Sequence, residues 1–176
     1  MASNSKKCIL TGLILGSIAA VSAGLIALTN LITADKIEKN EKDRILAGIS
    51  EIFRENSKIN KDKELTKYEY TVRYYEVTTK KDKFLGYAFK CEGSNMYGKI
   101  ALLAGFEATS HSFMSMSLIT NEQTYASTLE DNYIVPLNNE EKGLDDVSCG
   151  ATYGAKLVRD MINDAEKAAK DLWKKK

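Results

Sequence analysis

The hydrophobic and polar positions divide the chain into one long apolar stretch, a charged amphipathic segment, a series of short alternating stretches and a final amphipathic segment. The apolar stretch runs from Cys8 to Ala34, 27 residues without a charge. As a helix it would extend about 40 Å, which exceeds the roughly 30 Å apolar core of a bilayer. We therefore predict a transmembrane anchor over residues 8–34, after a cytoplasmic tail of residues 1–7.

The main alternative to a retained anchor is a cleavable signal peptide. Such a peptide has a shorter apolar region and an Ala-x-Ala-like site, to which residues 21–23 are only a partial match. Cys8 precedes the apolar run instead of closing it, which disfavours a lipoprotein. Lys6 and Lys7 favour a cytoplasmic N-terminus, although basic residues also follow the apolar run. We expect a single pass across the cell (inner) membrane, with the rest of the chain outside the cytoplasm.

Residues 35–66 carry many charges of both signs. Apolar residues recur there at helical spacing, which predicts an amphipathic helix and linker leading away from the membrane. Because the charges are mixed, we favour a helix that packs on the following domain over a basic helix that lies on the membrane surface. Its apolar positions are Ile45, Leu46, Ile49, Ile52 and Phe53.

Four short stretches then predict strands: three follow the two-residue period, and the third, near residues 100–106, is more uniformly apolar. They span residues 68–74 (with Tyr68, Tyr70, Val72 and Tyr74 on one face), 85–91, 100–106 and 114–118. In the last of them we expect Met114, Met116 and Leu118 to be buried on one face. Ser115 and Ser117 would lie on the other. Turns at residues 80–83 and 92–95 keep the connections short, which predicts antiparallel pairing.

From Tyr153 to Leu172 the helical period returns, and basic residues follow at the end, where they suit the helix dipole. The sequence thus predicts an α+β fold: a single N-terminal transmembrane helix, then a small antiparallel-sheet domain flanked by helices. We place this domain at residues 67–176. The apolar stripe of its last helix is Val158, Met161, Ile162, Ala165, Ala169 and Leu172.

Composition and charge argue against several functional classes. The 25 basic residues are balanced by 24 acidic ones, so nothing indicates a nucleic-acid partner. The three cysteines, Cys8, Cys91 and Cys149, have no Cys-x-x-Cys spacing, and His111 is the single histidine. We therefore expect no zinc, iron–sulfur or His-rich metal site and no disulfide framework.

Candidate chemistry is concentrated in residues 146–152, which read Asp-Val-Ser-Cys-Gly-Ala-Thr directly before the last helix. A turn of small residues there presents the Thr152 hydroxyl at a helix N-terminus, where free amides and the positive end of the dipole suit a phosphate. The simpler interpretation is that Thr152 is the helix N-cap and accepts a hydrogen bond from a first-turn amide. The residues alone favour this simpler interpretation.

The same segment resembles the flavinylation motif Asp-x-x-Ser/Thr-Gly-Ala-Thr of FMN-binding domains. These occur in the G subunit of the Rnf electron-transport complex and in the C subunit of the sodium-pumping NADH:quinone oxidoreductase. Other parts of the chain resemble the family in the same order. They are residues 32–37 at the end of the membrane helix, a glycine-tyrosine strand at 86–89 and a Gly-x-Ile strand at 98–100.

The resemblance implies that Thr152 carries FMN through a phosphoester bond, made by a dedicated flavin transferase with FAD as the donor. It also implies that this transferase reads Asp146, whereas an Asx-type turn is an alternative role for that residue. Gly150 and Ala151 would let the backbone approach the phosphate closely.

The chain departs from the family pattern in two places. Cys149 stands where Ser or Thr is usual, and we expect no redox role for it. The family's Glu-Thr-Pro-Gly-Leu-Gly loop, which lies beside the flavin ring, is Glu-Gln-Thr-Tyr-Ala-Ser over residues 122–127, so only Glu122 is kept. Ser148, Cys149 and Glu122 are counted with the cofactor-binding residues. Because the loop differs, the family's contacts to the flavin ring cannot be assigned to residues of this chain.

The resemblance implies an electron-relay subunit of an ion-translocating ferredoxin:NAD⁺ oxidoreductase of the Rnf type, beside other membrane subunits and with no catalytic residue of its own. The NADH:quinone complex is less favoured because its subunit is usually longer. A stand-alone, membrane-anchored flavinylated shuttle is the second interpretation. A pilin-like structural protein is the third, but pilins have a Glu near the start of the apolar helix, and residues 8–34 contain no acid.

Overall fold

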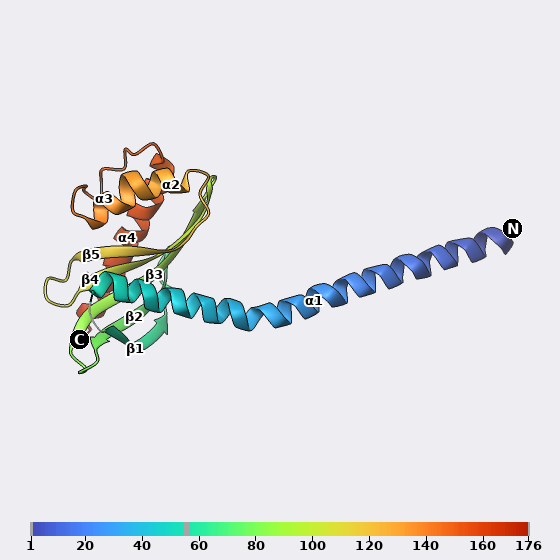
Figure 1. Cartoon of the computed structure of the whole chain (residues 1–176), viewed down its shortest axis with the longest axis horizontal. Helices are drawn as coiled ribbons and strands as arrows, with labels where there is room; N and C mark the ends of the chain where they lie inside the picture. The colour runs from blue at the N-terminus through green and yellow to red at the C-terminus, as the bar shows by residue number, and fades with distance from the viewer. Residues whose placement is uncertain (1, 55–56, 176) are drawn as a thin grey trace. The chain divides into compact units, whose positions relative to one another are not determined.

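The computed structural model describes residues 2–54 and 57–175, and it divides into two compact units, residues 1–42 and 43–176. One uninterrupted helix, α1 (Ala2–Phe53), contains the predicted anchor and most of the charged segment (Figure 1). The sequence between the anchor and Ile45 contains neither proline nor glycine, so nothing breaks the helix where the apolar stretch ends.

The first unit has the surface expected of a membrane helix. Large apolar side chains between Leu10 and Ile32 are exposed, Leu31 at 73% and Ile26 at 71%. The hydroxyl of Thr29 donates to the carbonyl of Leu25 at 2.8 Å, which satisfies it within the helix. α1 contains a stretch long and apolar enough to cross a membrane, and it fits the predicted single-pass anchor.

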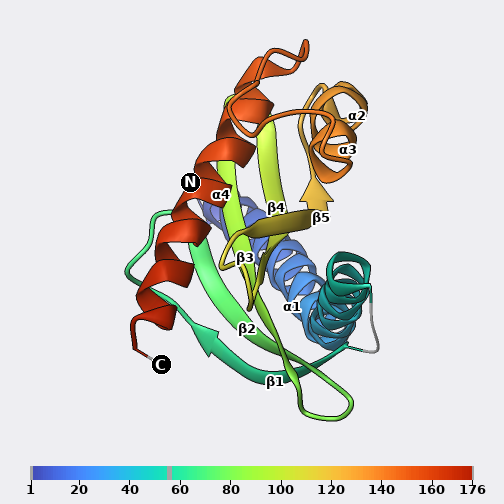
Figure 2. The same ribbon diagram turned by 90° about the vertical axis from the view of Figure 1, so that its left-hand side faces the viewer.

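The second unit is an antiparallel sheet with helices on both faces (Figure 2). Its strands pair in chain order: β1 (Ser57–Glu64), β2 (Thr71–Thr79), β3 (Phe84–Asn95), β4 (Gly98–Glu107) and β5 (Phe113–Asn121). After β5 come α2 (Ala126–Leu129), the π-helical turn η1 (Glu130–Ile134), α3 (Val135–Asn138) and α4 (Thr152–Trp173). This arrangement confirms the predicted α+β class and antiparallel pairing.

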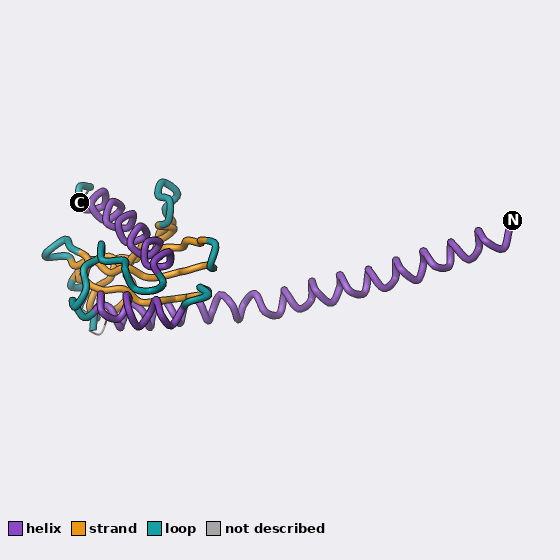
Figure 3. Tube along the Cα trace, turned by 90° about the horizontal axis from the view of Figure 1, so that it is seen from above, coloured by secondary structure: helices purple, strands orange, loops and turns teal. Residues whose placement is uncertain are grey.

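Two hydrophobic cores lie on opposite faces of the sheet, and helices cover the sheet on both sides (Figure 3). α4 covers the larger one through its predicted apolar stripe, with Val158 and Met161 fully buried. The end of α1 covers the smaller one through Ile45, Ile49, Ile52 and Phe53, which confirms a domain-packing helix. Leu46, predicted to join that stripe, is 48% exposed, because it lies about 100° around the helix from Ile45.

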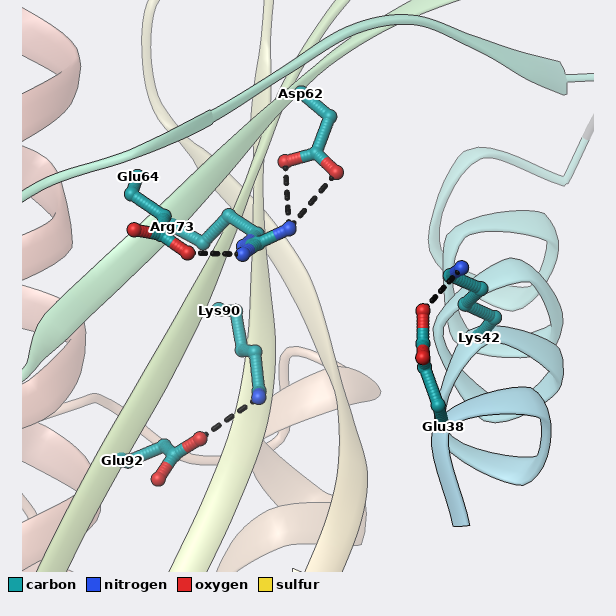
Figure 4. A network of polar contacts seen from close by, with 7 residues as sticks. All are labelled: Glu38, Lys42, Asp62, Glu64, Arg73, Lys90 and Glu92. Atoms are coloured by element: carbon teal, nitrogen blue, oxygen red, sulfur yellow. Dashed lines mark hydrogen bonds and ion pairs between the residues drawn. The ribbon is translucent and has the colours of Figure 1, made fainter. Parts of the chain in front are cut away.

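β1 is a strand where the sequence predicted helix or linker. Its eight residues include one large apolar side chain, Ile59, so they show no alternating pattern. Cross-strand charge holds it: Arg73 of β2 lies 3.0 Å from the Asp62 carboxylate and also pairs with Glu64 (Figure 4). Charged side chains of this kind are common on edge strands, where they oppose aggregation.

β2 begins at Thr71 instead of Tyr68, and the reason is a buried carboxylate on α4. One oxygen of Asp164, a residue 8% exposed, accepts the backbone amides of Tyr70 and Thr71 and the Thr71 hydroxyl, each at 3.0 Å. Both faces of the strand are covered, since Tyr74 packs towards α4 and Tyr75 towards α1. The predicted single buried face was therefore wrong for this strand.

The turn predicted at residues 92–95 lies instead at Met96 and Tyr97, because β3 continues to Asn95 and pairs there with Gly98. Gly93 suggested a turn, but it serves packing: a Cβ there would approach Leu157 of α4 within 2.9 Å. The glycine that the hairpin needs is Gly98, with φ +137° and the carbonyl of Glu122 2.1 Å from where a Cβ would be.

β5 confirms part of the predicted alternation. Met116 (1% exposed) and Leu118 pack into the larger core, and the Ser117 hydroxyl donates to Glu51 of α1 at 2.7 Å on the opposite face. Met114 packs towards the smaller core instead. A β-bulge causes this difference, because Ser115 pairs with Gly105 and Phe113 pairs with Phe106, which leaves Met114 as the extra residue.

Candidate functional site

A cleft of about 210 Å³ lies at the N-terminus of α4. Three segments far apart in sequence form it: the β3–β4 turn, the loop after β5 and the first turn of α4. The residues that line it are Tyr97, Gln123, Tyr125, Gly150, Ala151, Thr152, Tyr153 and Gly154. The structure therefore brings Gly150, Ala151 and Thr152 together at one cleft.

Thr152 is the first residue of α4 and not its N-cap. The cap residue is Ala151, whose carbonyl accepts the Ala155 amide at 3.0 Å, and no side chain caps the helix. The Thr152 hydroxyl makes no hydrogen bond to another residue that the structure describes, and its side chain is partly exposed. The N-cap interpretation is thus wrong, and the hydroxyl is left free at the cleft.

The local charge at Thr152 suits an anion. The amides of the first helical turn have no partner within the helix, and the first turn of α4 has no acidic residue to offset the positive end of the dipole. Lys156 is four residues on and hence on the same side of the helix, with its ammonium 6.0 Å from the centre of the Tyr153 ring.

The loop before the helix is held by Lys142. Its ammonium donates to the carbonyls of Asn132, at 3.2 Å, and Ser148, at 3.0 Å. The same ammonium lies 3.7 Å from the carboxylate of Asp146, whose side chain is 62% exposed. The Asp146 side chain therefore pairs with a lysine rather than with a backbone amide of an Asx turn, and it is accessible on the surface.

Cys149 and Gly150 serve the packing of this loop. Cys149 is 8% exposed and belongs to the larger core, so its thiol does not line the cleft. Gly150 has φ +82°, a conformation that favours glycine, and a Cβ there would lie 3.2 Å from the methyl group of Thr128. Small residues here let the chain pass close to α2 before α4 begins.

Glu122, the one family residue kept in the divergent loop, is exposed and does not line the cleft. Its neighbour Gln123 does. Gln123 is 7% exposed, its side-chain amide donates to the carbonyl of Gly98, and its side-chain oxygen lies 3.3 Å from the Cβ position of Gly154. Gln123 thus joins the start of β4 to the start of α4, a role that the sequence motif did not indicate.

Three tyrosines at the cleft were also missed by the sequence analysis. The Tyr97 ring lies 5.6 Å from that of Tyr153 and 6.1 Å from that of Tyr125, centre to centre. Each comes from a different segment, so no spacing in the sequence links them. The one available signal was Tyr125, which stands in the loop that departs from the family pattern.

These features fit FMN, which combines a phosphate with a flat aromatic ring system. Thr152 supplies an unpartnered hydroxyl at the positive end of a helix, and the tyrosines supply apolar ring surface in the same cleft. Among the described residues no group of His, Cys, Asp and Glu side chains could hold a metal ion.

Residues 1–52 match the family model described as RnfG N-terminal region. Over these residues the chain is similar to the N-terminal region of RnfG proteins. The match confirms the resemblance to the G subunit of the Rnf complex. It supports the interpretation of the chain as a subunit of an Rnf-type complex, which implies a part in electron transport and association with other Rnf subunits. RnfG proteins are flavin-associated in general, but the matched residues end before the cleft. A comparison with curated proteins gave no match.

Proposed function

We propose that the chain is an electron-relay subunit of an Rnf-type complex and carries FMN covalently on Thr152, in a domain outside the cytoplasm. The observation that carries the proposal is the free Thr152 hydroxyl, which lies at an acid-free helix N-terminus and lines a cleft walled by tyrosines. When bound, the flavin supplies the electron chemistry, and the protein supplies position and electrostatics.

The attachment step transfers an FMN group from FAD to the Thr152 oxygen. The bond between oxygen and the flavin-side phosphorus forms, the pyrophosphate bond breaks, AMP leaves and the hydroxyl loses its proton. Two features of this chain favour the step: first-turn amides that face an incoming phosphate, and a surface-exposed Asp146 for a transferase to recognise.

A covalent bond is the appropriate attachment for such a location. Outside the cytoplasm free FMN is dilute, so mass action would remove a reversibly bound flavin from its site. A phosphoester keeps one flavin on each chain whatever the surrounding concentration. The tether also allows an open cleft, because affinity no longer has to come from burying the ligand.

The first test concerns the side of the membrane on which the site lies. Fusions after residue 176 to alkaline phosphatase and to a cytoplasm-dependent fluorescent protein would report the location of the domain. We expect an active phosphatase and a dark fluorescent fusion, because Lys6 and Lys7 retain the short N-terminal tail in the cytoplasm. The reverse pattern would contradict both the orientation and an extracytoplasmic flavin.

The second test separates a complex from a stand-alone shuttle. The tagged full-length chain is purified from its own membranes in mild detergent, and the co-purifying proteins are identified. We expect further membrane-embedded subunits at fixed stoichiometry, and a chain-bound flavin that is reduced when the preparation receives reduced ferredoxin. A flavinylated chain that purifies alone, and whose flavin does not respond, would support the shuttle instead.

A further inference from the structure

We propose that Tyr97, Tyr125 and Tyr153 form the surface on which the flavin ring rests, with Tyr125 and Tyr153 as its accessible contacts. This inference rests on the proposed attachment at Thr152 and assigns the part of the site that the family resemblance left open. The family loop that lies beside the ring has a different sequence in this chain, and Tyr125 is the aromatic residue within it.

The exposure of these rings is the first argument. Tyr125 is 53% and Tyr153 59% exposed, whereas the core tyrosines Tyr75 and Tyr87 are 3% and 4% exposed. The three hydroxyls at the cleft make no hydrogen bond to other residues that the structure describes. Exposed aromatic surface whose hydroxyls take no part in holding the fold is typical of a binding surface.

The second argument is that the protein fixes the backbone beneath these rings. The Asn95 side chain accepts the Tyr97 amide at 2.8 Å and donates to the Tyr153 carbonyl at 3.2 Å. Thr124, next to Tyr125, donates its amide to the Tyr97 carbonyl at 2.9 Å. The Asn95 side chain thus joins the main chain at Tyr97 to that at Tyr153, and the Thr124 amide joins Tyr97 to the residue before Tyr125, although the three segments are separate in sequence.

The third argument is reach. Thr152 precedes Tyr153 directly, and both line the same cleft as Tyr97 and Tyr125. A flavin attached through its phosphate to Thr152 would have its ring at the end of a short ribityl chain, beside these side chains. Aromatic rings prefer offset-stacked or edge-to-face contacts with centroids about 4.5–7 Å apart, and the Tyr97 ring already lies in that range from both Tyr125 and Tyr153.

A tyrosine in contact with a flavin ring quenches its fluorescence by donating an electron to the excited state, and this gives a readout independent of turnover. Flavinylated full-length protein in detergent would be compared with Tyr125→Leu, Tyr153→Leu and the double variant. Tyr153→Trp keeps an electron-rich ring. Tyr68→Leu is the matched control, because Tyr68 contacts Asp171 at the opposite end of α4. Intact mass gives the flavin content of each sample.

We expect every variant to keep its adduct, and fluorescence per flavin to rise severalfold in the double variant, less in each single Leu variant, and not at all in Tyr68→Leu or Tyr153→Trp. Unchanged fluorescence per flavin in the double variant would overturn the ring assignment and leave the attachment standing. If the Leu variants lose the adduct while Tyr68→Leu and Tyr153→Trp keep it, these rings act in the attachment step, and the ring assignment is overturned as well. A native chain without any adduct would instead refute the proposed function.

Discussion

Thr152→Ala is expected to abolish flavin fluorescence that survives denaturation, while the domain still folds. The hydroxyl is the acceptor in our proposal, so its removal leaves nothing to esterify. Folding should be affected by no more than about 0.5 kcal/mol, because Thr152 makes no capping hydrogen bond and alanine is a good helix former. The measurement is in-gel fluorescence of denatured full-length protein, produced in a host that contains the flavin transferase.

Two controls make the Thr152→Ala result decisive. Thr152→Ser restores a hydroxyl at the same atom and should recover flavin to the extent that the transferase accepts serine. Thr124→Ala removes another hydroxyl near the cleft, one that donates to the Tyr97 carbonyl at 3.3 Å, and should keep its flavin. Denaturation-resistant flavin in Thr152→Ala would exclude this residue as the sole attachment point.

Met116→Lys should have the largest effect on stability. Met116 is 1% exposed in the larger core, on the strand that contacts α3, where an ammonium group would be buried among apolar side chains. A buried unpaired charge is among the few changes that cost about 4 kcal/mol or more. We expect the unfolding midpoint of the full-length protein in detergent to fall steeply, or the domain not to fold.

Met114→Lys is the matched comparison, two residues away on the same strand. Met114 is partly exposed at the β-bulge and packs towards the smaller core, so a lysine there can extend its ammonium into water. The cost should be about 1 kcal/mol. Equal destabilisation by the two substitutions would show that strict two-residue alternation, and not the bulge, describes this strand.

The sequence predicted the elements whose burial has one simple period. Three elements were predicted in this way: the apolar run of α1, the apolar stripe of α4 and the uniformly apolar stretch of β4 (Ile100 to Phe106). In each of them the pattern of apolar residues matches the surface that the element buries or exposes to the membrane. β1 escaped prediction because an edge strand held by backbone pairing and by Arg73 needs no apolar period. The β3–β4 turn was predicted at the wrong residues because Gly93 is required by its packing against α4, which lies more than 60 residues later in the chain.

The candidate site also contains residues that the sequence could predict and residues that it could not. Gly150, Ala151 and Thr152 are contiguous, so a local motif could indicate them. Tyr97, Gln123 and Tyr125 reach the cleft only through sheet register and the packing of α4, which no local pattern records. Cys149 shows the opposite case: it lies within the motif, yet its side chain belongs to the core.

The most direct test of the account is the intact mass of the chain purified from its native membranes, followed by mapping of the modified peptide. We predict a mass greater than that of the unmodified chain by one FMN less one water. Cleavage after Lys142 and Lys156 yields one peptide that contains Ser148, Thr152 and Tyr153, and its fragment ions should place the addition on Thr152. An unmodified mass, or an addition on Ser148 or Tyr153, would contradict the central claim.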